Sequence, residues 1–370
     1  MPTRHYPTHP AELTSEWLTA QLRAAGELKT ATVTDFSTVP VGEGIGMLGI
    51  LVRVVPTYDR SEPGAPRSLI AKFATPVEGN RAVAMAFHLY EREVLFYRSI
   101  APTVKARAPR CFGCEIDPSS GDSFLLLEDL GAYRTGDQVV GCSAAEAIGI
   151  IDAFVPLHAS FWGRTDDALL GGVPHIDGET QIAGISAGCA AGWDPCVDRF
   201  GHVMAAEIKA ARDRFVASVP ELHRMMGRRV QTLIHGDVRL DNVMLGTSPD
   251  QHPVVLLDWS LTISTGLHDL AYLLSQNVTI NERRAHEAEL VEYYYRRLTE
   301  LGVTGYSLEQ CWADYRVAVL YLFCYAVVIG GTLDPSNERG SQFMAQLIDR
   351  ASNAVIDHDL LSLLPSQAPA

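Results

Sequence analysis

Apolar and polar residues follow two different periods along the chain. In the first 130 residues, short runs rich in β-branched and aromatic residues predict strands over 32–40, 50–56 and 69–74 and two more strands before Leu130. A short amphipathic helix over 11–25 precedes these strands. The run AVAMAFHLYEREVLFYRSI has apolar residues three and four apart and predicts one long helix over 82–100. The segment 56–66, with its Pro, Gly, Asp and Ser residues, predicts a connecting loop.

A helical period dominates beyond residue 143. Ser143 with Glu146 three residues later is a capping box, which predicts a helix start. The segments GGVPHIDG and GWDPC predict loops. Further helices are predicted over about 195–226, 268–276, 281–301, 307–329 and 336–358. The pattern thus predicts a small α+β lobe over 1–130 and a larger, mainly helical lobe over 131–370.

Composition excludes several classes of protein. The 370 residues are 47% apolar, enough for one large or two medium domains. No run reaches the about 18 unbroken apolar residues of a membrane span, and the run over 319–331 predicts a buried helix. The N-terminus has no apolar signal core, and seven irregularly spaced cysteines predict reduced thiols in a cytoplasmic protein. Cys111 and Cys114 form a C-x-x-C, but no second pair or nearby His completes a zinc site.

The net charge of −14 is concentrated in the larger lobe. Residues 1–130 hold 13 Lys and Arg against 15 Asp and Glu, and the remainder holds 17 against 29. An acidic lobe attracts a cationic substrate and repels nucleic acid, although solubility explains the charge equally well. No basic patch with interleaved aromatic residues predicts nucleic-acid binding.

Candidate chemistry is densest in HGDVRLDNVML, which is followed by VVLLDW. Asp237 lies five residues before Asn242, and Asp258 follows sixteen residues later at the end of an apolar run. Phosphoryl transfer from a nucleoside triphosphate needs such a set: one carboxylate receives the proton of the attacking hydroxyl, and a carboxylate with an amide oxygen holds magnesium. The alternative interpretation is a turn between two strands, with Asn242 as a capping residue.

Upstream segments supply further parts in the same order. Gly42, Gly44, Gly46 and Gly49 lie between apolar segments, where backbone N–H groups can meet phosphate oxygens, although glycines also build ordinary hairpins. The stretch is neither a Walker loop nor a dinucleotide-binding fingerprint. Lys72 lies in the apolar strand SLIAKFA, where an ammonium needs a partner. The alternative for Lys72 is an edge-strand lysine that reaches solvent.

These motifs together resemble the aminoglycoside phosphotransferase and choline kinase superfamily. The resemblance rests on HGDxxxxN…DW and also on TSEWLTAQL, GEGIG, ExLFY and FLLLEDLG, and it covers roughly residues 11–355. These segments point to the ecdysteroid kinase-like branch. The resemblance implies a bilobal protein-kinase-like fold of the α+β class, with a small antiparallel-sheet lobe and a larger helical lobe. One departure is Ser260, where that branch often has Gln or Glu.

The resemblance also implies roles for particular residues, with ATP and Mg²⁺ as cofactors. Asp237 is the catalytic base, and Asn242 and Asp258 bind the metal. His235 orients the catalytic loop. Arg239 either neutralises developing phosphate charge or is a solvated surface residue.

In the smaller lobe, the resemblance places Lys72 on the phosphates. The ExLFY pattern selects Glu93 as the partner of Lys72, with Glu91 as the alternative. At the hinge, adenine meets the carbonyl of Glu128 and the N–H of Leu130, with Leu127 beside the base.

Asp269 in HDLAYLL matches an acid that begins a helix and braces the catalytic loop. We interpret it as structural support, because a carboxylate is also favourable at a helix N-terminus.

Two lengths distinguish the chain from protein kinases. About a hundred residues separate the hinge from the catalytic loop, and only eleven separate Asp258 from Asp269. The second interval leaves no room for an activation segment, so a polypeptide acceptor is disfavoured. The predicted acceptor is a small molecule with a hydroxyl group, either cationic or a polycyclic alcohol. A nucleotide-binding pseudokinase is the alternative function, and no membrane partner is expected of this monomer or homodimer.

Aromatic residues of the helical region have two interpretations. They either line an apolar or cation-binding pocket or belong to the core, and core packing is the favoured interpretation. These residues are Trp162, Trp193, Tyr293 and Tyr294.

Overall fold

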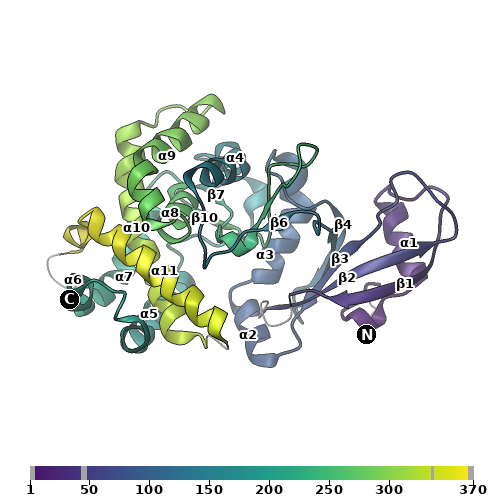
Figure 1. The fold of residues 1–370 in the computed structure, drawn as a ribbon, viewed down its shortest axis with the longest axis horizontal. Helices are drawn as coiled ribbons and strands as arrows, with labels where there is room; N and C mark the ends of the chain where they lie inside the picture. The colour runs from purple at the N-terminus through teal and green to yellow at the C-terminus, as the bar shows by residue number, and fades with distance from the viewer. Residues whose placement is uncertain (1–4, 43–47, 335–336, 366–370) are drawn as a thin grey trace. The chain divides into compact units, whose positions relative to one another are not determined.

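The computed structural model describes residues 5–42, 48–334 and 337–365. The chain divides into two compact units, coloured by residue number in Figure 1. Unit 1 comprises Met1–Thr103 and Ala108–Ala132, and unit 2 comprises Val104–Arg107 and Tyr133–Ala370. The chain therefore passes between the units three times.

Unit 1 is built on a five-stranded antiparallel sheet in the order β1-β2-β3-β5-β4. The strands are β1 (Val33–Pro40), β2 (Gly49–Tyr58), β3 (Leu69–Ala74), β4 (Cys111–Asp117) and β5 (Asp122–Glu128). All five strands were predicted, although β2 extends into the segment predicted as a loop. Two sequence neighbours, β4 and β5, complete the sheet beyond β3, so β4 is an edge strand.

The sheet of unit 1 has a different partner on each face. Side chains alternate between the faces of a strand. Phe124 and Leu126 of β5 therefore join the core beneath α1 (Ser15–Ala24), which contributes Leu18 and Leu22. The opposite face carries Leu125 and Leu127 and is covered by α3 (Leu89–Leu95).

The long helix predicted over 82–100 is wrong, because the segment forms two helices and a separate turn. α2 (Glu78–Ala86) ends before His88, which has a φ of 53°, and α3 is followed by a π-helical turn at Phe96–Ile100. The two helices are attached to different parts of the unit. Arg81 of α2 donates to the carbonyl of Ser120 at 2.8 Å, whereas Tyr90 of α3 donates to the carbonyl of Leu48 at 2.7 Å. The left-handed residue changes the chain direction between these anchors.

Unit 2 is mainly helical, as predicted, with several very short strands. Its helices are α4 (Ala144–Phe161), α5 (Glu179–Phe200), α6 (Ala206–Ala210), α7 (Arg212–Gly227), α8 (Leu267–Gln276), α9 (Ile280–Glu300), α10 (Leu308–Thr332) and α11 (Glu338–Asp357). Its strands are β6 (Arg134–Thr135), β7 (Thr232–Ile234), β8 (Val243–Leu245), β9 (Val254–Leu256) and β10 (Thr262–Ser264). They form a three-stranded sheet, β6-β8-β9, and the pair β10-β7.

The central helix of unit 2 is α10, which packs against α5, α8 and α11. Among the described residues, α4 and α10 are long and apolar enough to span a membrane, but 50% and 72% of their apolar windows are buried inside the protein. A core helix of a globular domain has the same length and hydropathy. The prediction that 319–331 is part of a buried helix is therefore confirmed. That helix is α10, which begins eleven residues earlier, at Leu308.

The loop predicted from GWDPC is wrong, because Pro195 lies inside α5. A proline within a helix cannot donate to the carbonyl four residues earlier. Here the neighbouring Trp193 is almost fully buried, and its ring lies 5.4 Å from that of Phe215 and 6.3 Å from that of Phe323. Burial of such an aromatic side chain contributes about 2–3 kcal/mol, which offsets much of the cost of the lost hydrogen bond. The single helix predicted over 195–226 is instead the end of α5 followed by α6 and α7.

Candidate active site

The catalytic loop begins directly after β7, at His235. Gly236 has a φ of +88°, and a Cβ atom built on it would lie 2.5 Å from the carbonyl oxygen of Ser260. Both the left-handed backbone and the close approach require glycine at this position. Ser260, the departure from the motif of the resembled branch, thus lies against the loop through its backbone.

The side chain of Asp269 holds this loop from the first turn of α8. Its carboxylate accepts the backbone N–H of His235 at 2.7 Å and that of Gly236 at 3.0 Å, and it also meets Nε2 of His158 at 3.1 Å. Burial alone raises the pKa of Asp269, but hydrogen bonds from His158 and His268 outweigh burial and hold that pKa well below its usual range. The prediction that Asp269 braces the catalytic loop is confirmed by these contacts.

His235 lies between the loop and the strand that leads to Asp258. Its Nδ1 accepts the backbone N–H of Asp237 at 3.2 Å, so Nε2 carries the proton and donates to the carbonyl of Leu257 at 2.9 Å. Its ring centroid is 4.5 Å from that of Trp259. Burial lowers the pKa of His235. A neutral imidazole with both nitrogens engaged positions the backbone, which agrees with the role expected from the sequence.

The structure brings together the three residues predicted for phosphoryl transfer. Nδ2 of Asn242 donates to a carboxylate oxygen of Asp237 at 2.9 Å and to its carbonyl at 3.1 Å. The backbone carbonyl of Asn242 accepts the N–H of Leu257 at 2.9 Å, which fixes Asn242 beside the residue that precedes Asp258. Asp258 has a φ of 58°, an uncommon conformation that Asp tolerates better than most residues.

Two further side chains face the carboxylate of Asp237. Nε of Arg239 lies 3.3 Å from a carboxylate oxygen of Asp237. Burial by itself lowers the pKa of Arg239, but the negative charges of Asp237 and Asp258 raise it overall, so the guanidinium is charged. Tyr272 of α8 places its hydroxyl within hydrogen-bonding reach of Asp237, and burial together with this carboxylate raises the pKa of Tyr272 well above its usual value.

Tyr272 was missed by the sequence analysis, and so was Asn277 at the C-terminal cap of α8. Oδ1 of Asn277 accepts the backbone N–H of Leu240 at 2.9 Å. Tyr272 follows Asp269 by three residues, so both lie on one face of α8. That spacing in HDLAYLL was the available signal. α8 therefore contacts the catalytic loop with three polar side chains.

Unit 1 carries the predicted phosphate-binding lysine. Nζ of Lys72 lies 2.8 Å from each carboxylate oxygen of Glu93, which comes from α3. Glu91, the alternative partner, lies beside His88, with 3.3 Å between Nδ1 and Oε1. The partly buried lysine thus has the partner that its apolar strand requires.

The remaining nucleotide-binding predictions stay predictions. Gly42 has a φ of +69°, and a Cβ atom there would meet nothing within 4 Å. Gly44 and Gly46 lie outside the described residues. Leu127 is opposite Ile70 in the sheet. Nearby, the backbone N–H of Glu128 donates to the carbonyl of Arg110 at 2.8 Å, and Leu130 is buried.

The aromatic residues of the helical region mostly pack within unit 2. Trp193 and Tyr294 are almost fully buried, and the hydroxyl of Tyr294 lies 2.9 Å from Nδ1 of His158. The ring of Trp162 lies 5.0 Å from that of Tyr306, and the hydroxyl of Tyr293 donates to Asp152 at 2.7 Å. Core packing is thus the better interpretation for Trp193 and Tyr294.

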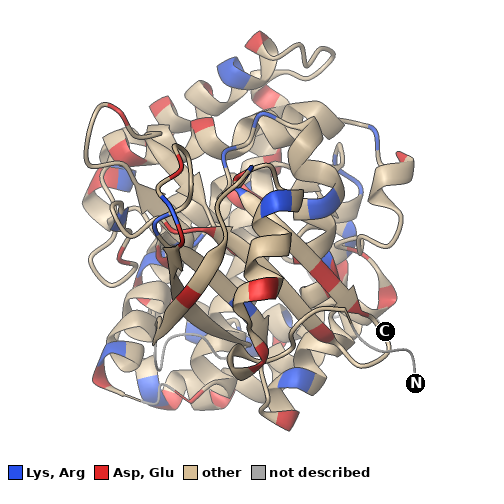
Figure 2. Cartoon of the chain, turned by 90° about the vertical axis from the view of Figure 1, so that its right-hand side faces the viewer, with Lys and Arg blue, Asp and Glu red and all other residues tan. Residues whose placement is uncertain are grey.

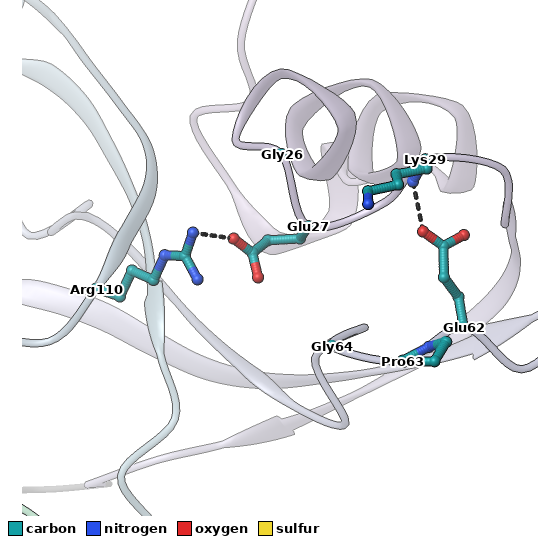
Figure 3. A pocket seen from close by; sticks show the side chains of 7 residues that line it. All are labelled: Gly26, Glu27, Lys29, Glu62, Pro63, Gly64 and Arg110. Carbon is teal, nitrogen blue, oxygen red and sulfur yellow. Dashed lines mark hydrogen bonds and ion pairs between the residues drawn. The ribbon is translucent and has the colours of Figure 1, made fainter.

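A hollow of about 370 Å³ in unit 1 is lined by the turn after α1, the β2–β3 loop and Arg110. Figure 3 draws its lining side chains. Both acidic side chains of its lining have partners: Glu27 pairs with Arg110, and Glu62 accepts the backbone N–H of Lys29 at 2.6 Å. Backbone hydrogen bonds lower the pKa of Glu62 to about 2. These contacts join the end of α1 to the β2–β3 loop and give the hollow a structural role.

Within the described residues, no group of three or more His, Cys, Asp or Glu side chains is arranged to hold a metal ion. Asn242 and Asp258 offer one amide and one carboxylate. Hard oxygen ligands of this kind suit Mg²⁺, which commonly takes one or two protein ligands and completes its shell with phosphate oxygens and water. Because Nδ2 of Asn242 donates to Asp237, Oδ1 is the amide atom that would meet the ion. The two residues therefore fit a nucleotide-bound magnesium.

Comparison with known proteins gives a family and a fold. A sequence model of the Ecdysteroid kinase-like family matches residues 43–162 and 188–304. These ranges contain the glycine stretch from Gly44 onward, the lysine and its partner, the predicted hinge and the whole loop from His235 to Asn242. No curated protein sequence matches the chain.

Solved structures share the fold at low sequence identity. The GDP complex of aminoglycoside 2'-phosphotransferase-IIIa aligns with a TM-score of 0.52 at 14% identity, over 92% of this chain and 99% of that one. The complex of that enzyme type with GDP and kanamycin gives the same TM-score and identity, over 92% and 98% of the two chains. Choline kinase from Cryptosporidium parvum Iowa II aligns with a TM-score of 0.54 at 8% identity, over 95% and 98%. These similarities confirm the bilobal α+β kinase-like fold class expected from the sequence.

Proposed function

The chain belongs to the ecdysteroid kinase-like family, and on that premise we propose that it is an ATP- and Mg²⁺-dependent kinase that phosphorylates a hydroxyl group of a small molecule. The proposal rests on the cluster of Asp237, Asn242 and Asp258. The loop that carries Asp237 is fixed by hydrogen bonds from the backbone N–H groups of His235 and Gly236 to Asp269. A turn between two strands would not need a buried carboxylate to fix two successive N–H groups of the loop.

Asp237 is the proposed base. Its carboxylate orients the acceptor hydroxyl and receives its proton while the acceptor oxygen attacks the γ-phosphorus. Asn242 keeps one carboxylate oxygen of Asp237 in place through a 2.9 Å hydrogen bond. Arg239, which is charged and lies beside Asp237, is positioned to stabilise negative charge on the transferred group.

Nucleotide-binding roles are assigned to several groups of residues. Asn242 and Asp258 would hold Mg²⁺, which when bound neutralises charge on the phosphate oxygens. Lys72, oriented by Glu93, is assigned to the α and β phosphates. The glycine stretch at Gly42, together with Gly44 and Gly46 beyond the described residues, is assigned to the same phosphates.

The remaining nucleotide contacts are assigned to the hinge. Leu127, the carbonyl of Glu128 and the N–H of Leu130 are assigned to the adenine base. Two solved structures with a similar fold contain GDP, which supports the proposal that this fold binds a nucleotide.

The acceptor is proposed to be a small molecule. Between Asp258 and the start of α8 the described chain forms only β10 and short connections, so this stretch holds no activation segment of the kind that binds an extended polypeptide in protein kinases. A cationic amino sugar or amino alcohol competes with a neutral polycyclic alcohol. Lys, Arg, Asp and Glu are interspersed on the side drawn in Figure 2. We favour the cationic acceptor on the ground of the net charge of −14.

The proposed setting is the cytoplasm. All seven cysteines are free, which suits a reducing compartment. The proposed assembly is a monomer or homodimer, with no membrane or nucleic-acid partner.

The test measures ADP release with ATP and Mg²⁺ across aminoglycosides, choline, sugars, macrolides and sterols. Asp237→Asn is the matched control, because it removes the base but keeps the size of the side chain. We expect one acceptor class to stimulate ADP release in the wild type and not in Asp237→Asn, while both proteins bind ATP in a thermal-shift assay.

The alternative function has a distinct signature in the same experiment. A nucleotide-binding pseudokinase would gain thermal stability from ATP but release no ADP with any acceptor. Phosphorylation of proteins in a mixed extract would instead indicate a protein kinase.

A further inference from the structure

Two of the seven cysteines, Cys111 and Cys114, lie on the edge strand β4 and take no part in the proposed phosphoryl transfer. Residues three apart on a regular strand point to opposite faces of the sheet. The register of β4 is irregular between Cys111 and Gly113, so that Cys111 is opposite Leu127 and Cys114 is opposite Leu125. Since residues two apart on β5 share a face, the irregularity places both thiols on one face.

Phe112, one of the two residues between them, supports this orientation. Phe112 belongs to the core on the α1 side of the sheet. The face opposite to α1 therefore carries both cysteines, and their thiols lie within hydrogen-bonding reach of each other. Both are partly exposed, whereas the other five cysteines are buried.

The two thiols differ in their surroundings. The hydrogen bond from Cys111 lowers the pKa of Cys114 to about 7, against the effect of burial and with help from the positive charge of Arg98. The guanidinium of Arg98 is held there by a 3.2 Å hydrogen bond to the carbonyl of Cys114 and a 2.9 Å ion pair with Glu115. The same hydrogen bond and burial raise the pKa of Cys111. The guanidinium of Arg98 therefore lies beside Cys114, where its positive charge favours the thiolate of Cys114 over that of Cys111.

We propose that Cys111 and Cys114 form a dithiol modification site that a low-molecular-weight disulfide, such as oxidised glutathione, converts into an intramolecular disulfide. The thiolate of Cys114 attacks one sulfur of the small disulfide, whose S–S bond breaks and releases one thiolate. Cys111 then loses its proton to solvent, and its sulfur attacks the Cys114 sulfur of the mixed disulfide. The second small thiolate leaves, so the protein dithiol is oxidised and the small disulfide is reduced to two thiols.

The dithiol lies on an edge strand, where a disulfide can form with little change to the sheet. It also lies close to Lys72. β4 is hydrogen-bonded on one side only, and its register is already irregular, so a small shift there disturbs few ladder bonds. In the sheet, Cys114 is opposite Leu125, which is in turn opposite Lys72. Two strand spacings of about 4.8 Å separate Cys114 from Lys72 on the same face. The dithiol therefore lies in the wall of the Lys72–Glu93 site.

The test treats the reduced, full-length protein with increasing oxidised glutathione, blocks remaining thiols under native conditions and weighs the tryptic peptides. Cleavage after Arg110 and Arg134 leaves both cysteines in one peptide. We expect that peptide to lose the mass of two hydrogen atoms and to carry no glutathione. A persistent glutathione adduct, or two cysteines that still react with the blocking reagent at the highest glutathione concentration, would overturn the proposal.

Two single substitutions identify the nucleophile. Cys111→Ser should stop at a glutathione adduct on Cys114, and Cys114→Ser should react at Cys111 about five-fold more slowly. Equal rates in the two variants would contradict the assignment of Cys114. None of these measurements requires kinase activity. The dithiol proposal and the proposed kinase function can therefore be refuted independently of each other.

Discussion

Tyr272 has a buried hydroxyl beside the proposed base and a pKa raised well above its usual value, so it donates rather than accepts at neutral pH. A hydrogen bond to a charged group contributes about 1.5 kcal/mol, which corresponds to about ten-fold in rate if it holds Asp237 in the reacting orientation. We expect Tyr272→Phe to lower kcat about ten-fold and to leave the KM for ATP unchanged.

Tyr306→Phe is the control for Tyr272→Phe, because it also removes a tyrosine hydroxyl that donates to a carboxylate. The hydroxyl of Tyr306 also donates to a carboxylate, that of Asp314 at 2.9 Å, but outside the catalytic loop. Tyr306→Phe should lower the melting temperature and keep kcat. An unchanged kcat in Tyr272→Phe would remove Tyr272 from the site.

Gly236 allows a different prediction at the scale of one residue. An alanine there combines a φ of +88° with a Cβ only 2.5 Å from a backbone oxygen. Gly163 has a φ of +69° but nothing within 4 Å of a Cβ, so Gly163→Ala carries the strain without the collision. We expect Gly163→Ala to lower the free energy of unfolding by about 1 kcal/mol and Gly236→Ala by at least about 2 kcal/mol, measured by urea unfolding. Equal losses would mean that the loop moves away from Ser260 at no cost.

At the scale of elements, α8 acts as the support of the catalytic loop. Asp269→Asn would replace one acceptor oxygen of a fully buried carboxylate by an NH₂ group, which cannot accept the N–H bonds of the loop. Breaking such a buried, charged network costs about 3 kcal/mol, so we expect a lower melting temperature and a strong loss of turnover. Since the folded-state pKa of Asp269 is depressed, its contribution is present at neutral pH and is lost as pH falls below about 4, its unfolded pKa.

The comparison between Asp269→Asn and the wild type therefore has a defined pH dependence. Their melting temperatures should differ most near pH 7 and converge as the medium is made more acidic than pH 4. A constant difference at all pH values would indicate that the carboxylate charge does not contribute.

Elements were predictable where a local signal decided the backbone. The capping box at Ser143 starts α4 where expected, because both of its hydrogen bonds are local. The break at His88 was not predictable, since it depends on anchors in other parts of unit 1. The loop predicted at Pro195 was wrong for a similar reason. The packing of Trp193 against Phe215 and Phe323, which are distant in sequence, outweighs the local tendency of proline to end a helix.

The site shows the same limit. Asp237, Asn242 and Asp258 were found from their spacing, and the structure brings them together. Lys72 and Glu93 were found from an apolar strand and a helix motif, and they form an ion pair. Tyr272 was missed because its meaning depends on how α8 docks, and a buried tyrosine in an apolar helix looks like an ordinary core residue.

At the scale of the whole molecule, charge gives a prediction about the acceptor. Residues beyond 130 hold 29 acidic against 17 basic side chains. Attraction between exposed charges is screened over about 10 Å at 0.1 M salt. If the acceptor is cationic, we expect kcat/KM to fall several-fold between 50 and 500 mM NaCl, with the KM for ATP as an internal reference. A flat salt profile would favour the neutral polycyclic alcohol.

The chain alternates between its two units, and this limits where the gene can be split into two separately expressed fragments. The segment Val104–Arg107 belongs to unit 2 although unit 1 flanks it on both sides, and the carbonyl of Arg107 accepts the N–H of Leu256 at 3.1 Å. A cut after residue 130 would leave this segment in the first fragment, although it accepts a hydrogen bond from Leu256, two residues before Asp258 in the second fragment. We therefore expect two separately expressed halves to recover activity only if this segment binds to the second fragment during reassembly.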